Sequence, residues 1–334
     1  GLGLMKKNHY RVALQFFGHL RSYRKTFPYQ IAHIISEYNC DIFIHTWETE
    51  EHNDPTWHKS VSGNESIIKT NRQDLIERYQ PTALEIEDNS IVVQQGYFNG
   101  NNNILLRSMK AMLHSQQKVN ELRREYSLSH SIDYDFVITL RPDVMPLCRL
   151  NLDDYIQEFE FAKNVCIHFS NGAHQHSQGN KKIYTPLASD IFYISTPQTI
   201  DSIFNGNVNF FNRFYMDFNK VNIGGISAPE ASFNEMLLQC GVISRFYEFP
   251  YAVVRTTGNN HLKVSFEAIG KFEKKIDMPT YLEGLDGKEK KSSMYKIFSK
   301  LSNERIGKIQ KEINRFKRQL DTFSDWLKQI KESR

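Results

Sequence analysis

The sequence has no apolar run that approaches the roughly 18 to 20 residues needed to cross a bilayer. Its uncharged stretches are as short as strands and are interrupted by polar residues. The four cysteines, at positions 40, 148, 166 and 240, show no CxxC spacing, which argues against a zinc cluster and against a secreted disulfide scaffold. We therefore expect a soluble protein of a reducing cytoplasm.

The chain also lacks a strong excess of charge. Its 42 Lys and Arg against 38 Asp and Glu give a net charge of +4. The segment from Leu301 to the end holds nine basic and five acidic residues, and so carries this whole excess. The remainder is close to neutral and has no basic stripe with interleaved aromatic residues, which argues against a nucleic-acid partner.

Strand-like and helix-like segments alternate in the first half. Short β-rich apolar runs predict strands, and apolar residues at helical spacing predict helices between them. The predicted strands cover residues 11–17, 41–44, 83–86 and 136–140, and the predicted helices cover 27–38, 67–79 and 104–126. This alternation predicts an α/β fold with a mostly parallel, doubly wound sheet flanked by helices.

The second half is less regular. It holds predicted strands at 164–169, 190–195 and 262–269, a polar loop at 170–182, a helix from near Pro229 and a polar linker at 288–293. A separate helical element follows the linker.

Three polar clusters follow predicted strands. In a mostly parallel sheet, ligands bind beyond the carboxyl ends of the strands, where loops vary and helix N-termini point at the crevice. The clusters are Gly18-His19-Leu20-Arg21, His45-Thr46-Trp47-Glu48 and Arg141-Pro142-Asp143. We therefore expect a ligand site at this edge of the sheet.

The segment YDFVITLRPDV, residues 134–144, resembles the part of GT-A glycosyltransferases that ends in their metal-binding DxD motif, in the R-P-D form of bacterial polysaccharide enzymes. Asp143 matches the last Asp, so the resemblance implies a role in holding Mn²⁺ or Mg²⁺ on the donor diphosphate. Arg141 replaces the first Asp, which makes the metal optional, because an arginine fork can bind phosphate directly. The alternative is a strand-end salt bridge between Arg141 and Asp143.

The segments FFGHLRSYRKT, residues 16–26, and DIFIHTW, residues 41–47, resemble the first two strands of the same group. The resemblance implies that Gly18, His19 and Arg21 contact the nucleotide. His45 and Trp47 would stack on a base or sugar. The alternatives are an ordinary turn after the first strand and a tryptophan that closes the core.

Two carboxylates in the second half are candidate catalytic residues. Glu230 follows Pro229 at an expected helix start and resembles the xED-type carboxylate that serves inverting GT-A enzymes as general base, although Pro-Glu is also ordinary helix-start chemistry. Asp190 lies in the apolar run ASDIFYIS, where a lone carboxylate needs a partner or a ligand. In similar proteins an Asp at this place faces the sugar site.

The histidines of the second half divide into two cases. His168, His174 and His176 lie within nine residues, but the loop between them has no cysteine or acidic residue. We therefore expect no zinc there and interpret the loop as one that closes over bound donor. His261 stands where GT-A enzymes often supply a late histidine ligand to the diphosphate-bound metal. The resemblance therefore implies a metal-binding role for His261.

The tail has apolar residues at alternating spacings of three and four, which keeps one seam along a helix. They are Ile306, Ile309, Ile313, Phe316, Leu320, Phe323, Leu327 and Ile330. This pattern favours a homo-oligomer formed through a coiled coil. A helix lying on an anionic membrane surface, or packed on its own domain, is the alternative.

These observations divide the chain into a GT-A-like, Rossmann-type catalytic domain at 5–285, a linker at 286–302 and a helical tail at 303–334. The catalytic domain has a nucleotide-binding half at about 5–150 and an acceptor half at about 151–285. The four residues before Met5 are too short for a signal peptide.

The resemblance implies a glycosyltransferase that moves a sugar from a nucleotide-diphosphate-sugar donor to a cell-surface glycan or lipid-linked glycan acceptor. We expect it in the cytoplasm, with a peripheral position at the inner face of the cytoplasmic membrane as a further expectation. Inversion and retention both stay open. The alternative is a non-catalytic glycan-binding or assembly scaffold that keeps the fold.

Overall fold

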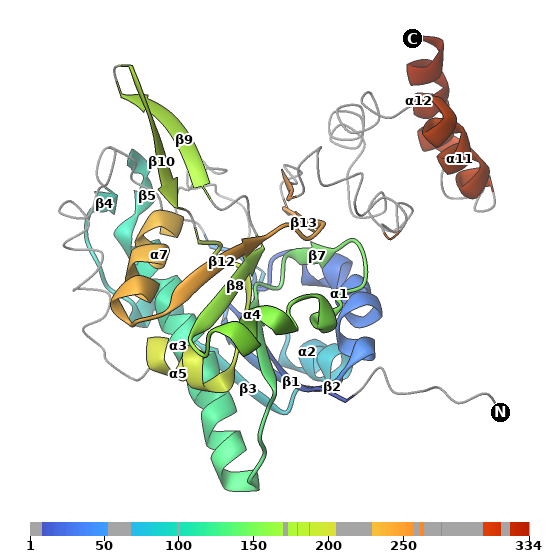
Figure 1. The fold of residues 1–334 in the computed structure, drawn as a ribbon. Helices are drawn as coiled ribbons and strands as arrows, with labels where there is room; N and C mark the ends of the chain where they lie inside the picture. Colours follow the sequence, from blue (N-terminus) through green and yellow to red (C-terminus); the bar gives the residue numbers. More distant parts are fainter. Residues whose placement is uncertain are drawn as a thin grey trace.

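A computed structural model describes residues 9–52, 68–98, 101–169, 173–178, 180–186, 188–204, 229–256, 261–263, 275, 303–314 and 321–333. In this part of the chain, a central sheet carries helices on both faces (Figure 1). No described helix combines the length and the apolar character that a membrane span requires.

The central sheet has seven strands in the order β12-β8-β11-β6-β1-β2-β3. The strands are β1 (Arg11–Phe17), β2 (Asn39–Trp47), β3 (Ala83–Glu87), β6 (Phe136–Leu140), β8 (Val165–Phe169), β11 (Phe192–Ser195) and β12 (Ile243–Tyr247). β11 runs antiparallel to both of its neighbours, and all other pairs are parallel. The fold is therefore α/β with a mostly parallel mixed sheet, compatible with a Rossmann-like arrangement.

The central strand β1 divides the core into two halves. Val12, Leu14 and Phe16 belong to one apolar cluster, and Ala13 and Phe17 belong to another, because successive side chains of a strand point to opposite faces. The first cluster includes residues of α1 (Tyr23–His33), α2 (Arg72–Tyr79) and α4 (Ile156–Phe161). The second includes residues of α3 (Leu106–His130), α5 (Pro197–Ile203) and α7 (Pro229–Gln239). Burial on both faces explains why β1 is largely apolar, with Gln15 as a buried polar residue.

Three smaller sheets and three 3₁₀ helices complete the described structure. β7 (Val144–Pro146), β13 (Tyr251–Val253) and β14 (His261–Leu262) form one sheet, β9 (Ala173–Gln178) and β10 (Lys181–Pro186) the second, and β4 (Tyr97–Phe98) and β5 (Asn101–Leu105) the third. The 3₁₀ helices are η1 (Ile35–Glu37), η2 (Asn89–Ile91) and η3 (Leu152–Asp154).

Local backbone and capping features set the ends of two helices whose bounds differ from the predicted ones. The helix predicted at 67–79 begins only at Arg72, because the Asn71 side chain accepts a hydrogen bond from Asp74 N at 3.1 Å and so caps the helix. It ends at Tyr79, before Gln80 with φ of 45°. α3 continues past the predicted end at 126 to His130 and stops before Ser131, which has φ of 52°. A left-handed residue is a common helix end.

The predicted polar loop at 170–182 is wrong in part, because the antiparallel strands β9 and β10 form there. β9 has the sequence AHQHSQ, which lacks the alternation of apolar and polar residues that marks a half-buried strand. The sequence of β9 therefore gives no strand signal.

The described tail has two helices, α11 (Asn303–Asn314) and α12 (Asp321–Glu332), which lie in contact. Ile306, Leu327 and Ile330, three residues of the predicted seam, are buried. Residues 315–320 lie outside the described residues, so the continuous heptad-patterned helix stays a prediction. The linker at 286–302 and most of the strand predicted at 262–269 also lie outside them.

Candidate functional site

A cavity of about 210 Å³ lies at the carboxyl ends of β1, β2 and β6. Gly18, Trp47 and Arg141, one residue from each of the three predicted clusters, line it. Its described lining includes five cationic side chains, those of Arg21, Arg107, Arg141, Arg255 and Lys263, and two carboxyl groups, those of Asp190 and Glu230. The excess of positive charge makes this cavity a site for an anion.

The turn between β1 and α1 brings backbone into the cavity wall. Gly18 has φ of 85°, a left-handed conformation that glycine adopts without steric cost. Its N–H donates to Ser115 Oγ at 2.7 Å, and its carbonyl accepts from Thr46 Oγ1 at 2.7 Å. The turn is therefore tied to α3 and to the end of β2.

Arg21, in the same turn, has φ of 49°, which is uncommon for a residue with a side chain. Its N–H donates to the Glu50 carbonyl at 2.8 Å, and this bond helps to hold the strained backbone. The buried Nε of Arg21 has no hydrogen-bond partner among the described residues. A strained residue with an unsatisfied buried donor at a cavity indicates a ligand-binding role.

Three arginines surround the carboxylate of Asp143. Arg141 binds it with two hydrogen bonds, Nε to Oδ1 at 2.9 Å and Nη2 to Oδ2 at 2.7 Å. The Nη1 atoms of Arg21 and Arg255 lie 3.7 and 3.8 Å from Oδ2. Asp143 is fully buried, so one negative charge lies among three cationic groups, and Glu51 Oε1, 3.8 Å from Arg21 Nε, adds a second negative charge beside them.

This surrounding charge sets the protonation of Asp143. Burial would raise the pKa of the Asp143 carboxyl, but the guanidinium groups of Arg141, Arg21 and Arg255 outweigh burial and hold the pKa well below its ordinary value. The strand-end salt bridge that was the alternative reading of Arg141 and Asp143 is present. Both carboxylate oxygens are engaged by arginine, so Asp143 does not fit the role of a cation ligand in this arrangement.

Arg255 was not among the predicted site residues. It follows the apolar run Tyr251–Val254. Both backbone groups of Val254 are hydrogen-bonded: its N–H donates to the Asp143 carbonyl at 2.9 Å, and its carbonyl accepts from Ser22 Oγ at 2.5 Å. Burial and the nearby Arg141 lower the pKa of Arg255 to about 10, which leaves it cationic at neutral pH. A basic residue directly after an apolar run is the same signal that marked Arg141.

Asp190 reaches the cavity because β11 runs antiparallel. The start of β11 lies beside the end of β6, where Phe192 pairs with Leu140 and the Arg141 N–H donates to the Ile191 carbonyl at 2.9 Å. Burial, and then the negative charge of Glu230, raise the pKa of Asp190 to about 7, against the opposing effect of Arg141. This carboxyl therefore changes its protonation near neutral pH.

Glu230 lies in the first turn of α7 and lines the same cavity. Its carbonyl accepts from Ala188 N at 3.1 Å, which joins the start of α7 to the segment that carries Asp190. The two carboxyl groups predicted from separate parts of the sequence therefore lie in one wall. Their environments differ, since Asp190 is buried and Glu230 is partly exposed.

Of the aromatic and histidine residues that were predicted to contact the ligand, His19 and Trp47 line the cavity and His45 does not. His19 lines the cavity, and its Nδ1 donates to the Thr49 carbonyl at 2.8 Å. Burial lowers the pKa of His19 to about 4, so its neutral ring leaves Nε2 as an acceptor. Trp47 lines the cavity with a ring that is 1% exposed, and His45 is fully buried behind it. The predicted stacking of both residues on a ligand stays a prediction.

Some predicted residues cannot be placed in the site. His261 forms backbone pairing with Val253 in β14, and the position of its side chain lies outside the described structure. Its predicted metal role stays a prediction. Residues 205–228, which precede the helix of Glu230, also lie outside the described residues.

Comparison of the chain with protein-family models and with curated proteins found no match. The fold and the cavity are therefore the basis for assigning a function.

Proposed function

We propose that the protein transfers a sugar from a nucleotide-diphosphate donor, with the arginine-lined cavity at the ends of β1, β2 and β6 as the donor site. The observation that carries this proposal is the set of three arginines around one buried carboxylate. Their excess positive charge is fixed before a ligand arrives, which is the arrangement that best stabilises a leaving diphosphate.

The sheet and the sequence segment support the donor assignment. YDFVITLRPDV forms β6 and the turn after it, so the motif that resembles GT-A enzymes lies at the cavity. The mostly parallel sheet is compatible with that GT-A-like resemblance. Gly18 has no side chain and so allows the ligand to approach the protein backbone closely, and Arg21 lies in the same turn.

In the proposed reaction, a hydroxyl oxygen of the acceptor bonds to the anomeric carbon of the donor sugar. The bond between that carbon and the diphosphate oxygen breaks, and the diphosphate leaves with the electron pair. Glu230 would accept the hydroxyl proton if the enzyme inverts configuration. Asp190 would orient sugar hydroxyls, and its protonated form near pH 7 can donate a hydrogen bond.

The arginines take the part that Mn²⁺ or Mg²⁺ plays in metal-dependent transfer. Arg141 occupies both oxygens of Asp143, and two further guanidinium groups lie within 4 Å of Oδ2. A divalent cation would replace favourable bonds with repulsion at this position. We therefore propose transfer that does not require a metal at Asp143.

The test is turnover of a panel of nucleotide-diphosphate sugars with glycan acceptors, in the presence of EDTA and separately of Mn²⁺. We expect one donor to be consumed in EDTA, and Glu230→Gln to lower kcat by at least about 100-fold with donor binding retained. The matched control is Glu235→Gln, a change in the same helix at a residue that does not line the cavity. Donor binding without turnover by the wild type would instead favour the glycan-binding or assembly scaffold.

A further inference from the structure

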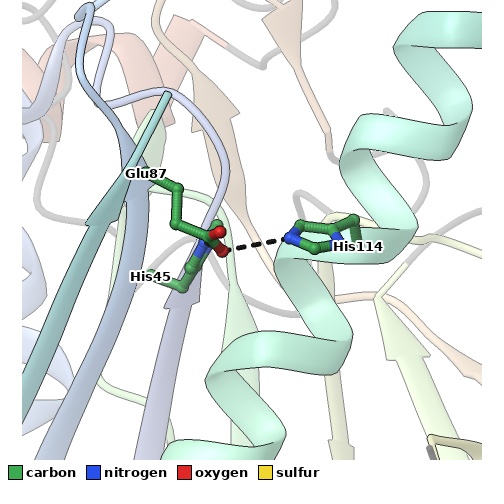
Figure 2. A group of neighbouring side chains, drawn as sticks. All are labelled: His45, Glu87 and His114. Carbon is green, nitrogen blue, oxygen red and sulfur yellow. Dashed lines mark hydrogen bonds and ion pairs between the residues drawn. The ribbon is translucent and has the colours of Figure 1, made fainter. Parts of the chain in front are cut away.

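A second group of side chains lies next to Trp47 and does not line the cavity. His45 in β2, Glu87 at the end of β3 and His114 in α3 converge there (Figure 2). His45 Nε2 and His114 Nε2 lie 2.8 and 3.0 Å from the same oxygen, Glu87 Oε1. One potential ligand atom from each side chain falls within 4.8 Å of the other two.

We propose that His45, Glu87 and His114 form a binding site for Zn²⁺. Two imidazole nitrogens and one carboxylate oxygen are a ligand set that zinc accepts, and three protein ligands leave a position for water or a further ligand. At metal–ligand distances of about 2.0 to 2.2 Å, the ligand atoms of a tetrahedral site lie about 3.3 Å apart. The two Nε2 atoms would therefore move a few tenths of an ångström away from Glu87 Oε1, and the two histidine ligand atoms, which now lie within 4.8 Å of each other, would settle at about 3.3 Å.

One of the two histidines also has the hydrogen-bond partner that metal-binding histidines usually have. A metal-binding histidine usually bonds its second ring nitrogen to an oxygen, which fixes the ring and its tautomer. His45 Nδ1 lies 2.6 Å from Ser115 Oγ. If Nδ1 carries the proton and donates it to Ser115, the lone pair of Nε2 faces Glu87 and is available to an ion.

The surroundings give the site one closed side and one accessible side. His45 is fully buried, whereas the side chains of Glu87 and His114 are 21% and 32% exposed. Trp47 stacks on His114 with ring centroids 5.7 Å apart and meets the His45 ring edge-on at 5.1 Å. An ion can therefore reach the group from the side of Glu87 and His114, and Trp47 separates it from the anion cavity.

Hydrogen bonds alone offer a competing explanation, since one carboxylate oxygen can accept a hydrogen bond from the N–H of each imidazole. The two explanations differ in what His114→Gln does. The glutamine amide can still donate to Glu87, so a hydrogen-bonded network survives, but it is a poor zinc ligand. His130→Gln is the matched control, because His130 lies in the same helix, is exposed and stacks on Tyr126.

The experiment is titration of the full chain, free of affinity tags, with ZnCl₂ against a chromophoric chelator. We expect wild type and His130→Gln to bind one more equivalent of zinc than His114→Gln, or to bind it more than about 100-fold more tightly, a larger effect than the loss of an outer partner. Equal stoichiometry and affinity in wild type and His114→Gln, or no zinc bound by the wild type, would refute the site.

A measurement on the wild type alone keeps the proposal testable if a variant misfolds. X-ray absorption at the zinc edge of the one-to-one complex should show two imidazoles among nitrogen and oxygen ligands at about 2.0 to 2.2 Å. Sulfur ligands, or a shell with one imidazole or none, would overturn the assignment. Neither readout depends on sugar transfer, so failure of the zinc site leaves the proposed function standing.

Discussion

At the scale of single residues, Asp143 has a structural role that its motif position does not reveal. The R-P-D segment places a basic and an acidic residue at the end of a strand. This pattern fits both interpretations of Asp143, as a metal ligand and as the partner of a salt bridge. In the folded chain Arg255 favours the salt bridge, because its guanidinium adds a further positive charge beside Asp143. Arg255 lies 112 positions after Asp143 in the sequence. Local sequence cannot report a contact over that separation.

Asp143→Asn should lower the free energy of unfolding by about 3 to 5 kcal/mol at pH 7, because it removes the buried negative charge that three largely buried guanidinium groups share. The pKa of Asp143 is lowered in the folded chain. Its stabilisation is therefore present above the unfolded value of about 3.9 and is lost as the pH falls below it. Urea unfolding of both proteins from pH 7 to pH 3 measures this.

The control for that series is Asp133→Asn, since Asp133 is exposed and its change should stay within about 0.5 kcal/mol. A difference between wild type and Asp143→Asn that stays constant from pH 7 to pH 3 would contradict the charge assignment.

Asp190 should show the opposite dependence on pH, because its pKa is raised to about 7 in the folded chain. Its protonated form stabilises the folded state fully below the unfolded value of about 3.9, and this contribution is lost as the pH rises through 7. Asp190→Asn should therefore be more stable than wild type at pH 8, by up to about 4 kcal/mol, and the gap should close toward pH 4. The urea midpoints of the two proteins at each pH test this, and a wild type more stable at pH 8 would refute it.

At the scale of elements, the strands with a strong pattern of apolar residues were predictable from the sequence. β1 and β6 begin and end at the predicted residues, because strands buried on both faces are short apolar runs bounded by polar residues. β9 was not predictable, because its sequence AHQHSQ is almost entirely polar. The direction of β11 was not predictable either, since a strand pattern reads the same in both directions. Its antiparallel course is nevertheless what brings Asp190 beside Arg141.

The turn after β1 offers a prediction at this scale. A Cβ at Gly18 would meet no atom within 4 Å, so any cost of substitution comes from φ of 85° and not from a clash. Gly18→Ala should destabilise the protein by about 1 to 2 kcal/mol. Gly18→Asn should cost less, because asparagine tolerates the left-handed region better.

Chemical denaturation of the Gly18→Ala and Gly18→Asn variants beside the wild type measures these free energies of unfolding. Equal stability of the alanine and asparagine variants would show that the backbone conformation of this turn is not what sets their stability.

At the scale of the whole molecule, the modest net charge of +4 conceals an uneven distribution. The tail carries an excess of basic residues in sequence, and the cavity gathers a second group of cations from distant segments. Composition could identify the first group, because its members are neighbours in sequence. It could not identify the second, because Arg21, Arg141 and Arg255 meet only in the fold.

Self-association through the tail stays a prediction. The burial of Ile306, Leu327 and Ile330 within one chain shows that α11 and α12 already cover part of the seam. If the tail nevertheless forms an oligomer, removal of residues beyond Ser302 should lower the mass in solution to that of one shortened chain. Light scattering of both forms measures this, and a single-chain mass for the full chain would exclude the oligomer.

The central claim is that fixed arginines, without a metal at Asp143, form the site of a nucleotide diphosphate. Calorimetric titration of nucleotide diphosphates in EDTA tests it most directly, with Arg255→Ala beside the wild type. The control is Arg124→Ala, because Arg124 is a half-buried arginine of α3 that does not line the cavity. We predict that wild type and Arg124→Ala bind one nucleotide diphosphate in EDTA and that Arg255→Ala binds it at least about 10-fold more weakly, since a charge-assisted contact contributes roughly 1.5 to 3 kcal/mol. Binding that needs Mn²⁺, or equal affinity in wild type and Arg255→Ala, would contradict the account.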